Sequence, residues 1–325
     1  DVLWELKAVA QGLTDDQSIK ECIKPHKSKI FTLPFPEIKP EPGCEYFLDI
    51  SFCTREKTEL IPAGYEAAWE QFKLPYYKPK VLTKISRAAK IKQKSRDGKL
   101  YMEGLDFTYI FNLKKGHFVS LNYMDKELIK SGTVPFFCTP NFWRAPTDND
   151  YGNKMPQRLG IWKDAGKNRI IERVESRQNS NRDILIEVEA ALPDVESRYF
   201  TSFHIFGNGE IEVLNRFVPG KKDLPDLPRF GVQMTLGSEF DNISWYGRGP
   251  YESYWDRKSG AKVGIYRGKV KDQYQPYIRP QENGNKTDVR WLALTNKEGI
   301  GLLVVGNPFL SVSAHHFLSE DFDSG

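Results

Sequence analysis

Hydrophobic and polar residues alternate with a period of two along many short segments, and this pattern constrains the fold most. Between residues 184 and 190, one set of positions carries only Ile, Val and Ala, while Glu187 and Glu189 fall in the other set. Residues 199–205 repeat the pattern, and Gly207-Asn208-Gly209 then predicts a hairpin turn into Ile211 and Val213. Because strands do not alternate with helices, a Rossmann fold or TIM barrel is excluded and an all-β fold is predicted.

The strand pattern divides the chain into two parts. Residues 4–10 and 46–53 alternate, and we expect Tyr46, Leu48, Ile50 and Phe52 to share one face of a strand. A unit of this size with short strands predicts a small immunoglobulin-like β-sandwich over residues 1–77, and a larger β domain over residues 78–325. In the larger part only residues 157–165 are predicted to be helical, with Gly166 as the stop.

Composition and motifs exclude several classes of function. No segment is long and apolar enough to span a membrane, and the basic run 80–99 lacks interleaved aromatic residues for nucleic acid, so we interpret it as a solvated segment. The four cysteines form no C-x-x-C pair and are predicted to be mostly free, buried thiols. The five histidines do not have the spacing of metal ligands, and neither G-x-S-x-G nor a P-loop occurs.

Residues 140–152 form the densest group of unusual residues. Two prolines, aromatic side chains, a single Arg and clustered Asp and Asn predict an ordered loop that presents polar groups. A structural alternative is a corner in which Arg144 pairs with Asp148 or Asp150 while Phe142 and Trp143 fill the core. A calcium loop starting at residue 148 is disfavoured because residue 159 is a leucine, so a tight Asx turn is the better interpretation.

Two further segments combine rings with turn residues. Residues 245–257 carry five aromatic rings, and residues 277–284 form a turn-rich polar patch. Rings contact the apolar faces of sugars, and Asp, Glu, Asn and Arg bind their hydroxyls, so these segments are typical of a sugar pocket. The structural alternative is core packing and a Pro-Gly corner.

Four motifs in order resemble the C-terminal small-chain domain of glycoside hydrolase family 2 β-galactosidases. They are Phe142–Asp150, Trp162–Gly166, Gly247–Arg257 and Tyr277–Gly284. Residues 63–72 resemble the end of the immunoglobulin-like domain that precedes this domain in the family. The resemblance covers nearly the whole chain.

The resemblance implies an immunoglobulin-like sandwich followed by a galactose-mutarotase-like β-supersandwich. It also implies an accessory region of a retaining enzyme that hydrolyses terminal non-reducing β-D-galactose residues. Both catalytic glutamates would lie on a barrel of ~250 residues outside this chain, so no catalytic residue and no cofactor is expected here. The implied partners are the barrel, which would carry Mg²⁺ and Na⁺ ions, and a second copy of the chain. The expected location is the cytoplasm or periplasm of a bacterium.

Family position also implies which residues border the sugar site. Gly152 matches a glycine that opens a loop beside it, and residues 151–158 would shape or gate the site. The family continues past residue 325 with a sugar-stacking Trp, so we expect an incomplete supersandwich. The implied rim residues are Asp148, Asn149, Asp150, Tyr151, Gly152 and Arg158, and the implied sugar contacts are Trp143, Arg144, Tyr251, Glu252 and Trp255.

Two other functions stay open at this point. An aldose-1-epimerase-type enzyme would need an acid and a base around a sugar ring, for which His204, Glu252 and Glu282 are candidates. A carbohydrate-binding module would use exposed rings without turnover, with Trp245, Tyr251, Tyr254 and Trp255 as its candidates.

Overall fold

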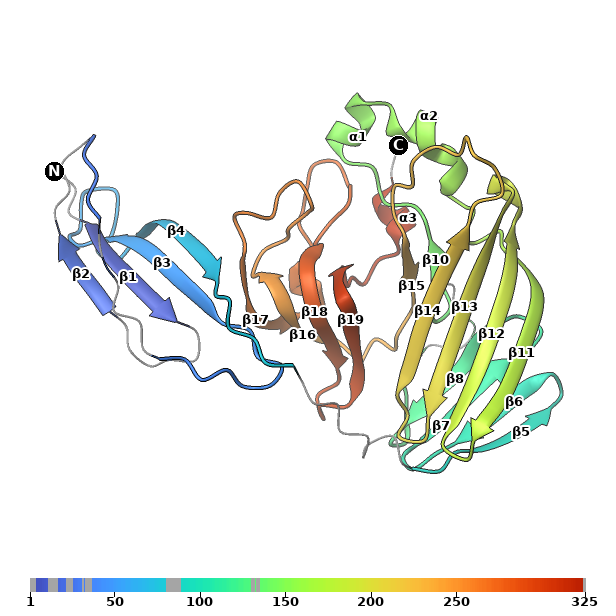
Figure 1. The fold of residues 1–325 in the computed structure, drawn as a ribbon. Helices are drawn as coiled ribbons and strands as arrows, with labels where there is room; N and C mark the ends of the chain where they lie inside the picture. The colour runs from blue at the N-terminus through green and yellow to red at the C-terminus, as the bar shows by residue number, and fades with distance from the viewer. Residues whose placement is uncertain are drawn as a thin grey trace. The chain divides into compact units, whose positions relative to one another are not determined.

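The structure, a computed structural model, describes residues 4–10, 17–21, 26–30, 32, 37–79, 89–129, 132 and 135–323. The chain divides into two compact units, Asp1–Thr83 and Lys84–Gly325. Nearly all regular elements are antiparallel strands, which confirms the all-β fold predicted from the alternation (Figure 1).

The first unit contains a four-stranded sheet in the order β2-β1-β3-β4. The predicted alternation of residues 46–53 does form a strand, but its faces are not divided as expected, because Phe47 and Cys53 are buried while Phe52 is 39% exposed. Phe47 and Cys53 both fall in the other set of alternating positions, so they are buried on the face opposite to the expected one. The register shift between Phe52 and Cys53, where β3 pairs with β4, places its extra residue on β4. The strands are β1 (Trp4–Ala10), β2 (Gln17–Glu21), β3 (Phe47–Thr54) and β4 (Glu66–Lys73).

The second unit is built on two antiparallel sheets that pack face to face. Their inner side chains form one hydrophobic core, which includes Phe111 and Phe118 from one sheet and Ile186 and Phe203 from the other. The first sheet consists of β5 (Lys92–Arg96), β6 (Lys99–Glu103), β7 (Phe107–Asn112), β8 (His117–Tyr123) and β9 (Lys126–Glu127). The second consists of β11 (Ile170–Ser180), β12 (Asp183–Leu192), β13 (Ser197–Phe206) and β14 (Ile211–Val218).

Strand β12 confirms the alternation most directly. Ile184, Ile186, Val188 and Ala190 are all buried against the first sheet or at its margin, while Glu187 is exposed. The predicted hairpin is also confirmed, since β13 and β14 pair antiparallel across the glycine turn. Period-two patterning therefore places the strands of this sheet correctly.

A third sheet in the same unit carries two of the three aromatic or turn-rich loops. Its order is β17-β16-β18-β19, and Ile243, Trp245, Val289 and Leu292 form its core with Val270. The strands are β16 (Asn242–Gly249), β17 (Lys262–Lys269), β18 (Lys286–Thr295) and β19 (Gly301–Val312). A separate two-stranded sheet pairs β10 (Thr139–Asn141) with β15 (Gly231–Gln233).

Helices are short and lie mainly in loops. The helix expected over residues 157–165 begins earlier, at Met155, and ends earlier, at Trp162, as α2 (Met155–Leu159) and the 3-10 helix η2 (Gly160–Trp162). Another helix, α1 (Asp148–Gly152), was not expected. The remaining helical turns are η3 (Pro193–Val195), η4 (Val270–Gln273) and α3 (Ser319–Phe322).

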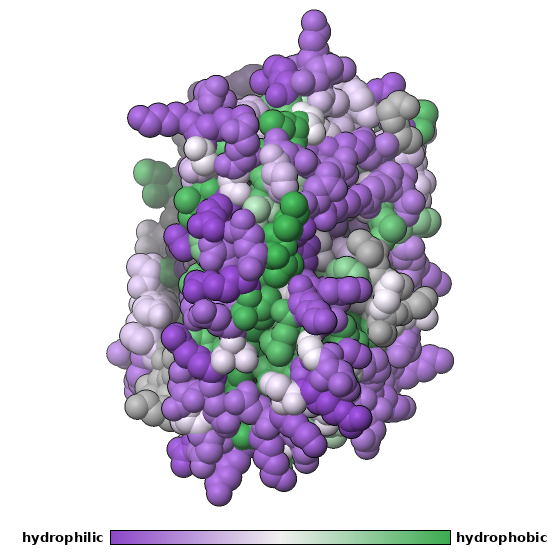
Figure 2. Space-filling view, turned by 90° about the vertical axis from the view of Figure 1, so that its right-hand side faces the viewer, coloured by the Kyte–Doolittle hydropathy of each residue, from purple (hydrophilic) through white to green (hydrophobic). Residues whose placement is uncertain are grey.

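Figure 2 shows the face of the second unit that carries β11, where an apolar strip crosses an otherwise hydrophilic surface. Edge strand β11 contains an exposed Ile170.

Cys53 and Cys138 are buried free thiols as predicted, Cys44 is free but partly exposed, and Cys22 lies outside the described residues. Within the described ranges, none of the helices has the length and apolar character that crossing a bilayer requires.

Candidate functional site

The corner formed by residues 140–152 is held from inside by its aromatic residues. Phe142 and Trp143 are buried in a cluster with Trp162 and Tyr199, and the indole of Trp143 donates a hydrogen bond of 3.1 Å to Asp323. The structural alternative is confirmed for these two rings: they fill the core.

Beside these rings, Arg144 pairs with Asp150 at 2.7 Å rather than with Asp148. The carboxylate of Asp150 also accepts hydrogen bonds from the backbone N–H and hydroxyl of Thr147, at 2.9 and 3.1 Å. The Thr147 hydroxyl oxygen in turn accepts a hydrogen bond from the Asp150 N–H, which completes a capping box at the start of α1. The predicted tight turn is therefore a short helix, and its sequence signal is the Thr-x-x-Asp spacing.

We call residues 140–152, 245–257 and 277–284 the first, second and third loops. Glu252 lies at the centre of the second loop. Its side chain is 5% exposed and pairs with Arg257 at 2.6 Å. The same carboxylate accepts a hydrogen bond of 3.1 Å from the Tyr254 hydroxyl and one of 3.0 Å from the Gly284 N–H, and it also accepts one from the Tyr277 hydroxyl. Glu252 thus joins the second loop to the loop that follows residue 276.

Glu282 joins this third loop to the first. Its backbone N–H donates to the carbonyl of Ala145 at 3.1 Å, and its carbonyl accepts the Tyr254 hydroxyl at 2.9 Å. Its carboxylate is buried and bound by Arg229 at 2.5 Å. The three loops that the sequence singles out therefore meet in one hydrogen-bonded layer of the second unit.

A second, more exposed set of contacts ties the third loop to helix α1. The side-chain oxygen of Gln281 accepts the Asp148 N–H at 3.2 Å. Arg279 lies 3.6 Å from the Asp148 carboxylate, and its guanidinium carbon is 5.0 Å from the centre of the Tyr151 ring. Because Arg279 and Asp148 have side chains 53% and 72% exposed, each of these contacts is weak by itself.

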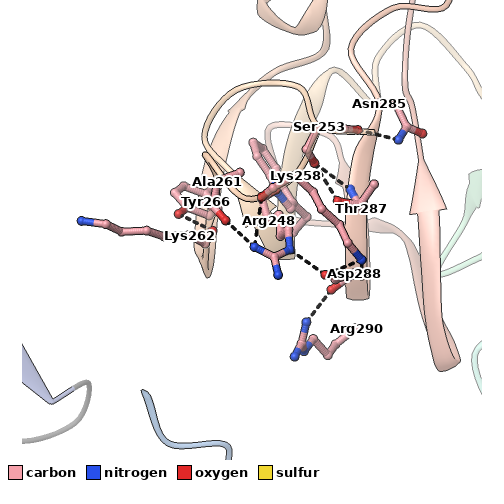
Figure 3. Close-up of polar contacts among 11 residues, drawn as sticks. Arg248, Ser253, Lys258, Ala261, Lys262, Tyr266, Asn285, Thr287, Asp288 and Arg290 are labelled. Atoms are coloured by element: carbon pink, nitrogen blue, oxygen red, sulfur yellow. Dashed lines mark hydrogen bonds and ion pairs between the residues drawn. The ribbon is translucent and has the colours of Figure 1, made fainter. Parts of the chain in front are cut away.

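Arg248 fixes the base of the second loop, as Figure 3 shows. Its guanidinium donates to the carbonyls of Lys258 and Ala261 at 3.1 and 2.8 Å and to Asp288 at 2.6 Å. Burial acts to raise the pKa of Asp288, but hydrogen bonds from Arg248 and Lys258 outweigh it and hold that pKa below its usual range. The loop that carries Trp255 is therefore rigidly anchored at its base.

Buried titratable groups surround Glu252. Burial, with the charges of Glu252 and Glu282, raises the pKa of the Tyr254 hydroxyl. Burial lowers the pKa of Lys286 to about 8, against the attraction of Glu252. Burial also lowers the pKa of His315, whose Nε2 donates to the carbonyl of Asn283 at 2.9 Å. Burial in this layer therefore disfavours the charged forms of Tyr254, Lys286 and His315.

Lys286→Met is expected to raise the free energy of unfolding by about 1–2 kcal/mol at pH 7, because a buried ammonium is replaced by an apolar side chain of similar length. The lysine has a pKa of about 8 when folded and roughly 10.4 when unfolded, so the unfolded chain binds more protons between these values. The desolvation penalty is therefore complete below pH 8 and disappears toward pH ~10.

Urea titrations of both proteins at pH 7 and pH 10 measure this difference, with Lys221→Met as a surface control. The gain should shrink at pH 10. An equal gain at both pH values would show that packing, rather than the charge, explains it.

The structure separates the predicted sugar contacts into two groups. Trp143 lies in the core, Arg144 pairs with Asp150, and Glu252 is buried under its partners. Tyr251 and Trp255 project outward, 76% and 75% exposed. The predicted rim residues Asp148, Asn149, Asp150, Tyr151 and Gly152 form α1, and Arg158 on α2 binds Asn153 at 3.0 Å.

The residues of the epimerase alternative are not brought together. The ring of His204 lies 2.8 Å from Asp183 and 3.8 Å from Glu212, on the sheet that contains β12 to β14. Glu252 and Glu282 instead contact the loops described above. Glu252 and Glu282 are held by arginines, which fits a structural role better than the acid and base of that reaction. Among the described residues, no group of three or more His, Cys, Asp or Glu side chains could hold a metal ion.

Sequence reasoning missed several members of this layer. Arg229 and His315 lie outside every motif, and no local pattern marks them. Lys286 lies two residues after the Tyr277–Gly284 motif, where an isolated lysine gives no sign that it is buried. Tyr277 was inside a motif, but its partner, Glu252, is 25 residues away.

Comparison with known families places these loops in a wider context. Residues 103–325 match the family model of the beta galactosidase small chain, and residues 1–75 match that of beta-galactosidase domain 4. The chain is 36% identical over 315 residues to a beta-galactosidase of Priestia megaterium, covering 97% of this chain and 30% of that protein. It is 33% identical over 281 residues to a beta-galactosidase of Lactobacillus delbrueckii subsp. bulgaricus, covering 85% and 26%.

A beta-galactosidase of Kluyveromyces lactis is 30% identical over 289 residues, covering 84% of this chain and 27% of that protein. The chain therefore spans less than a third of the length of these relatives. The small-chain match covers well over half of the chain and includes all three loops of the hydrogen-bonded layer. The chain belongs to the β-galactosidase family and corresponds to the C-terminal, small-chain part of its members.

Proposed function

We propose that the chain is an accessory region of a retaining β-galactosidase, which hydrolyses terminal non-reducing β-D-galactose residues. The observation that carries this proposal is that the carboxylates of Glu252 and Glu282 are both taken up by contacts within the layer. Glu252 and Glu282 are both buried and bound by arginines, tyrosine hydroxyls or backbone groups, so they serve as structural anchors. A retaining glycosidase needs two carboxyl groups that reach the sugar, and in this proposal a barrel outside these 325 residues supplies them.

The part of this chain nearest the sugar would be the rim, formed by α1 and the turn to α2. Asp148 and Gly152 are exposed there, while Asp150 anchors the helix from below. Tyr251 and Trp255 would offer exposed rings beside it. The catalytic barrel and a second copy of the chain are the proposed partners.

Hydrolysis of a chromogenic β-galactoside tests the proposal. The chain alone is expected to release no chromophore above the buffer rate, whereas the parent enzyme that contains it should be active. NMR of the first product should show β-galactose, the retained anomer. Hydrolysis by the chain alone, abolished in Glu252→Gln or Glu282→Gln but not in Glu187→Gln, would overturn the proposal.

One observation favours a second candidate, a sugar-binding surface without turnover. Tyr251 and Trp255 are exposed on a loop that Arg248 anchors, and Lys258 lies 4.2 Å over the Trp255 ring. However, Trp245 is buried, which removes one ring from the predicted platform. Titration of the chain with galactose, followed by tryptophan fluorescence, should show saturation that Trp255→Ala abolishes if this candidate is right.

A further inference from the structure

We propose that Glu252 is a positioning residue that fixes the rim helix α1 through the loop of residues 277–284. The role in holding α1 follows from this chain's own contacts. Only its consequence for galactoside binding rests on the proposed function.

Several hydrogen-bond donors converge on the carboxylate of Glu252. Arg257, Tyr254, Tyr277 and the Gly284 N–H all bind the Glu252 side chain, which is 5% exposed. Charged acceptors make stronger hydrogen bonds than neutral ones, and more so where water is excluded. Glu252 therefore holds both ends of the third loop, at residues 277 and 284.

The loop of residues 277–284 in turn contacts the first loop and helix α1. Between its two fixed ends lie Arg279, Gln281 and Glu282, each of which contacts the first loop or α1. Gln281 accepts the Asp148 N–H, one of the free donors at the start of the helix. Arg279 lies over Tyr151. Because these contacts are exposed, they hold α1 only if the loop itself is fixed.

A neutral side chain at position 252 would not bind the same set of donors. A glutamine at 252 keeps the shape but carries an NH2 group in place of one oxygen. That group would face the N–H of Gly284 or the guanidinium of Arg257, which are donors as well. Glu252→Gln should therefore release one end of the third loop, and with it α1.

Amide hydrogen exchange of the 325-residue chain is the direct test. In Glu252→Gln, the α1 amides of Tyr151 and Asn153 are expected to exchange about 2- to 30-fold faster, the range of coupling carried by contact networks. Core amides of β12 should not change. Glu187→Gln, which changes an exposed carboxylate on β12, is the matched control and should leave α1 unaffected.

Arg279→Ala is the second variant, because its exposed side chain is removed without disturbing the core. It should accelerate exchange in α1 alone, and the effects of the two variants should not add. Unchanged α1 exchange in either folded variant would overturn the proposal. If Glu252→Gln also loosens β12, Tyr277→Phe, which removes one donor to Glu252 and keeps the ring, takes its place in the comparison.

In the parent enzyme, Glu252→Gln should raise KM for a galactoside about 2- to 30-fold while kcat stays close to the unaltered value. A loss of kcat with unchanged KM would contradict a role in holding the rim. Changed exchange without any effect on KM would support the positioning of α1 and refute the rim role in the proposed function. The two failures are thus distinguishable.

Discussion

Replacing Trp245 with alanine is expected to destabilise the second unit by about 3–5 kcal/mol, the usual range for removing a large buried aromatic side chain. The ring is 2% exposed, packs against Tyr266 with centroids 5.3 Å apart, and donates from its indole N–H to the carbonyl of Arg248 at 2.9 Å. Its removal leaves a cavity beneath the second loop and takes the indole donor away from the Arg248 carbonyl. Urea unfolding followed by circular dichroism measures the loss.

Trp255→Ala is the matched control for this change. The same side chain is removed ten positions along the chain, but the ring is 75% exposed, so the free energy of unfolding should change by less than about 0.5 kcal/mol. Equal losses in the two variants would show that Trp255 is also a core residue and that the second loop is folded differently.

Asp150→Ala is the second substitution with a large expected effect, about 3 kcal/mol. It leaves Arg144 without its carboxylate and removes the side-chain half of the capping box, two changes that each destabilise a protein. Chemical denaturation of the chain at pH 7 measures it. Because the salt bridge is part-buried, 0.5 M salt should reduce the loss only slightly.

Asp148→Ala provides the comparison within the same helix. Its side chain is 72% exposed and lies 3.6 Å from Arg279, so the loss should stay below about 0.5 kcal/mol. A loss at Asp148 as large as that at Asp150 would mean that Arg144 pairs with either carboxylate, the choice that the sequence left open.

The strands could be predicted wherever one face is buried and the other solvated. Strand β12 met this condition, and its alternation predicted both its existence and its buried side chains. Strand β3 met it only in part, because its buried Phe47 and Cys53 lie on the face opposite to the one expected from Tyr46, Leu48, Ile50 and Phe52. Helix α1 was missed because five residues are too few for helical periodicity, although its capping box was visible.

The site was predictable as three loops but not as one layer. Each loop stood out through its own composition, whereas the contacts that join them connect residues far apart, such as Asp148 and Gln281, 133 positions from each other. Whether an aromatic ring points into the core or toward solvent was not predictable either. Trp245 and Trp255 belong to the same aromatic segment, residues 245–257, yet Trp245 lies buried on strand β16 and Trp255 lies exposed on a loop. Only tertiary packing makes that distinction.

The joining of three loops through shared side chains has a consequence for recombining this region with its relatives. A chimera that takes only residues 140–152 from a relative must fit the donor's helix to the Arg279 and Gln281 of this chain. The same mismatch arises if only residues 247–257 are exchanged, since Glu252 must meet the recipient's Tyr277 and Gly284. The three segments therefore form one unit of exchange, and hybrid enzymes should inherit them together from a single donor.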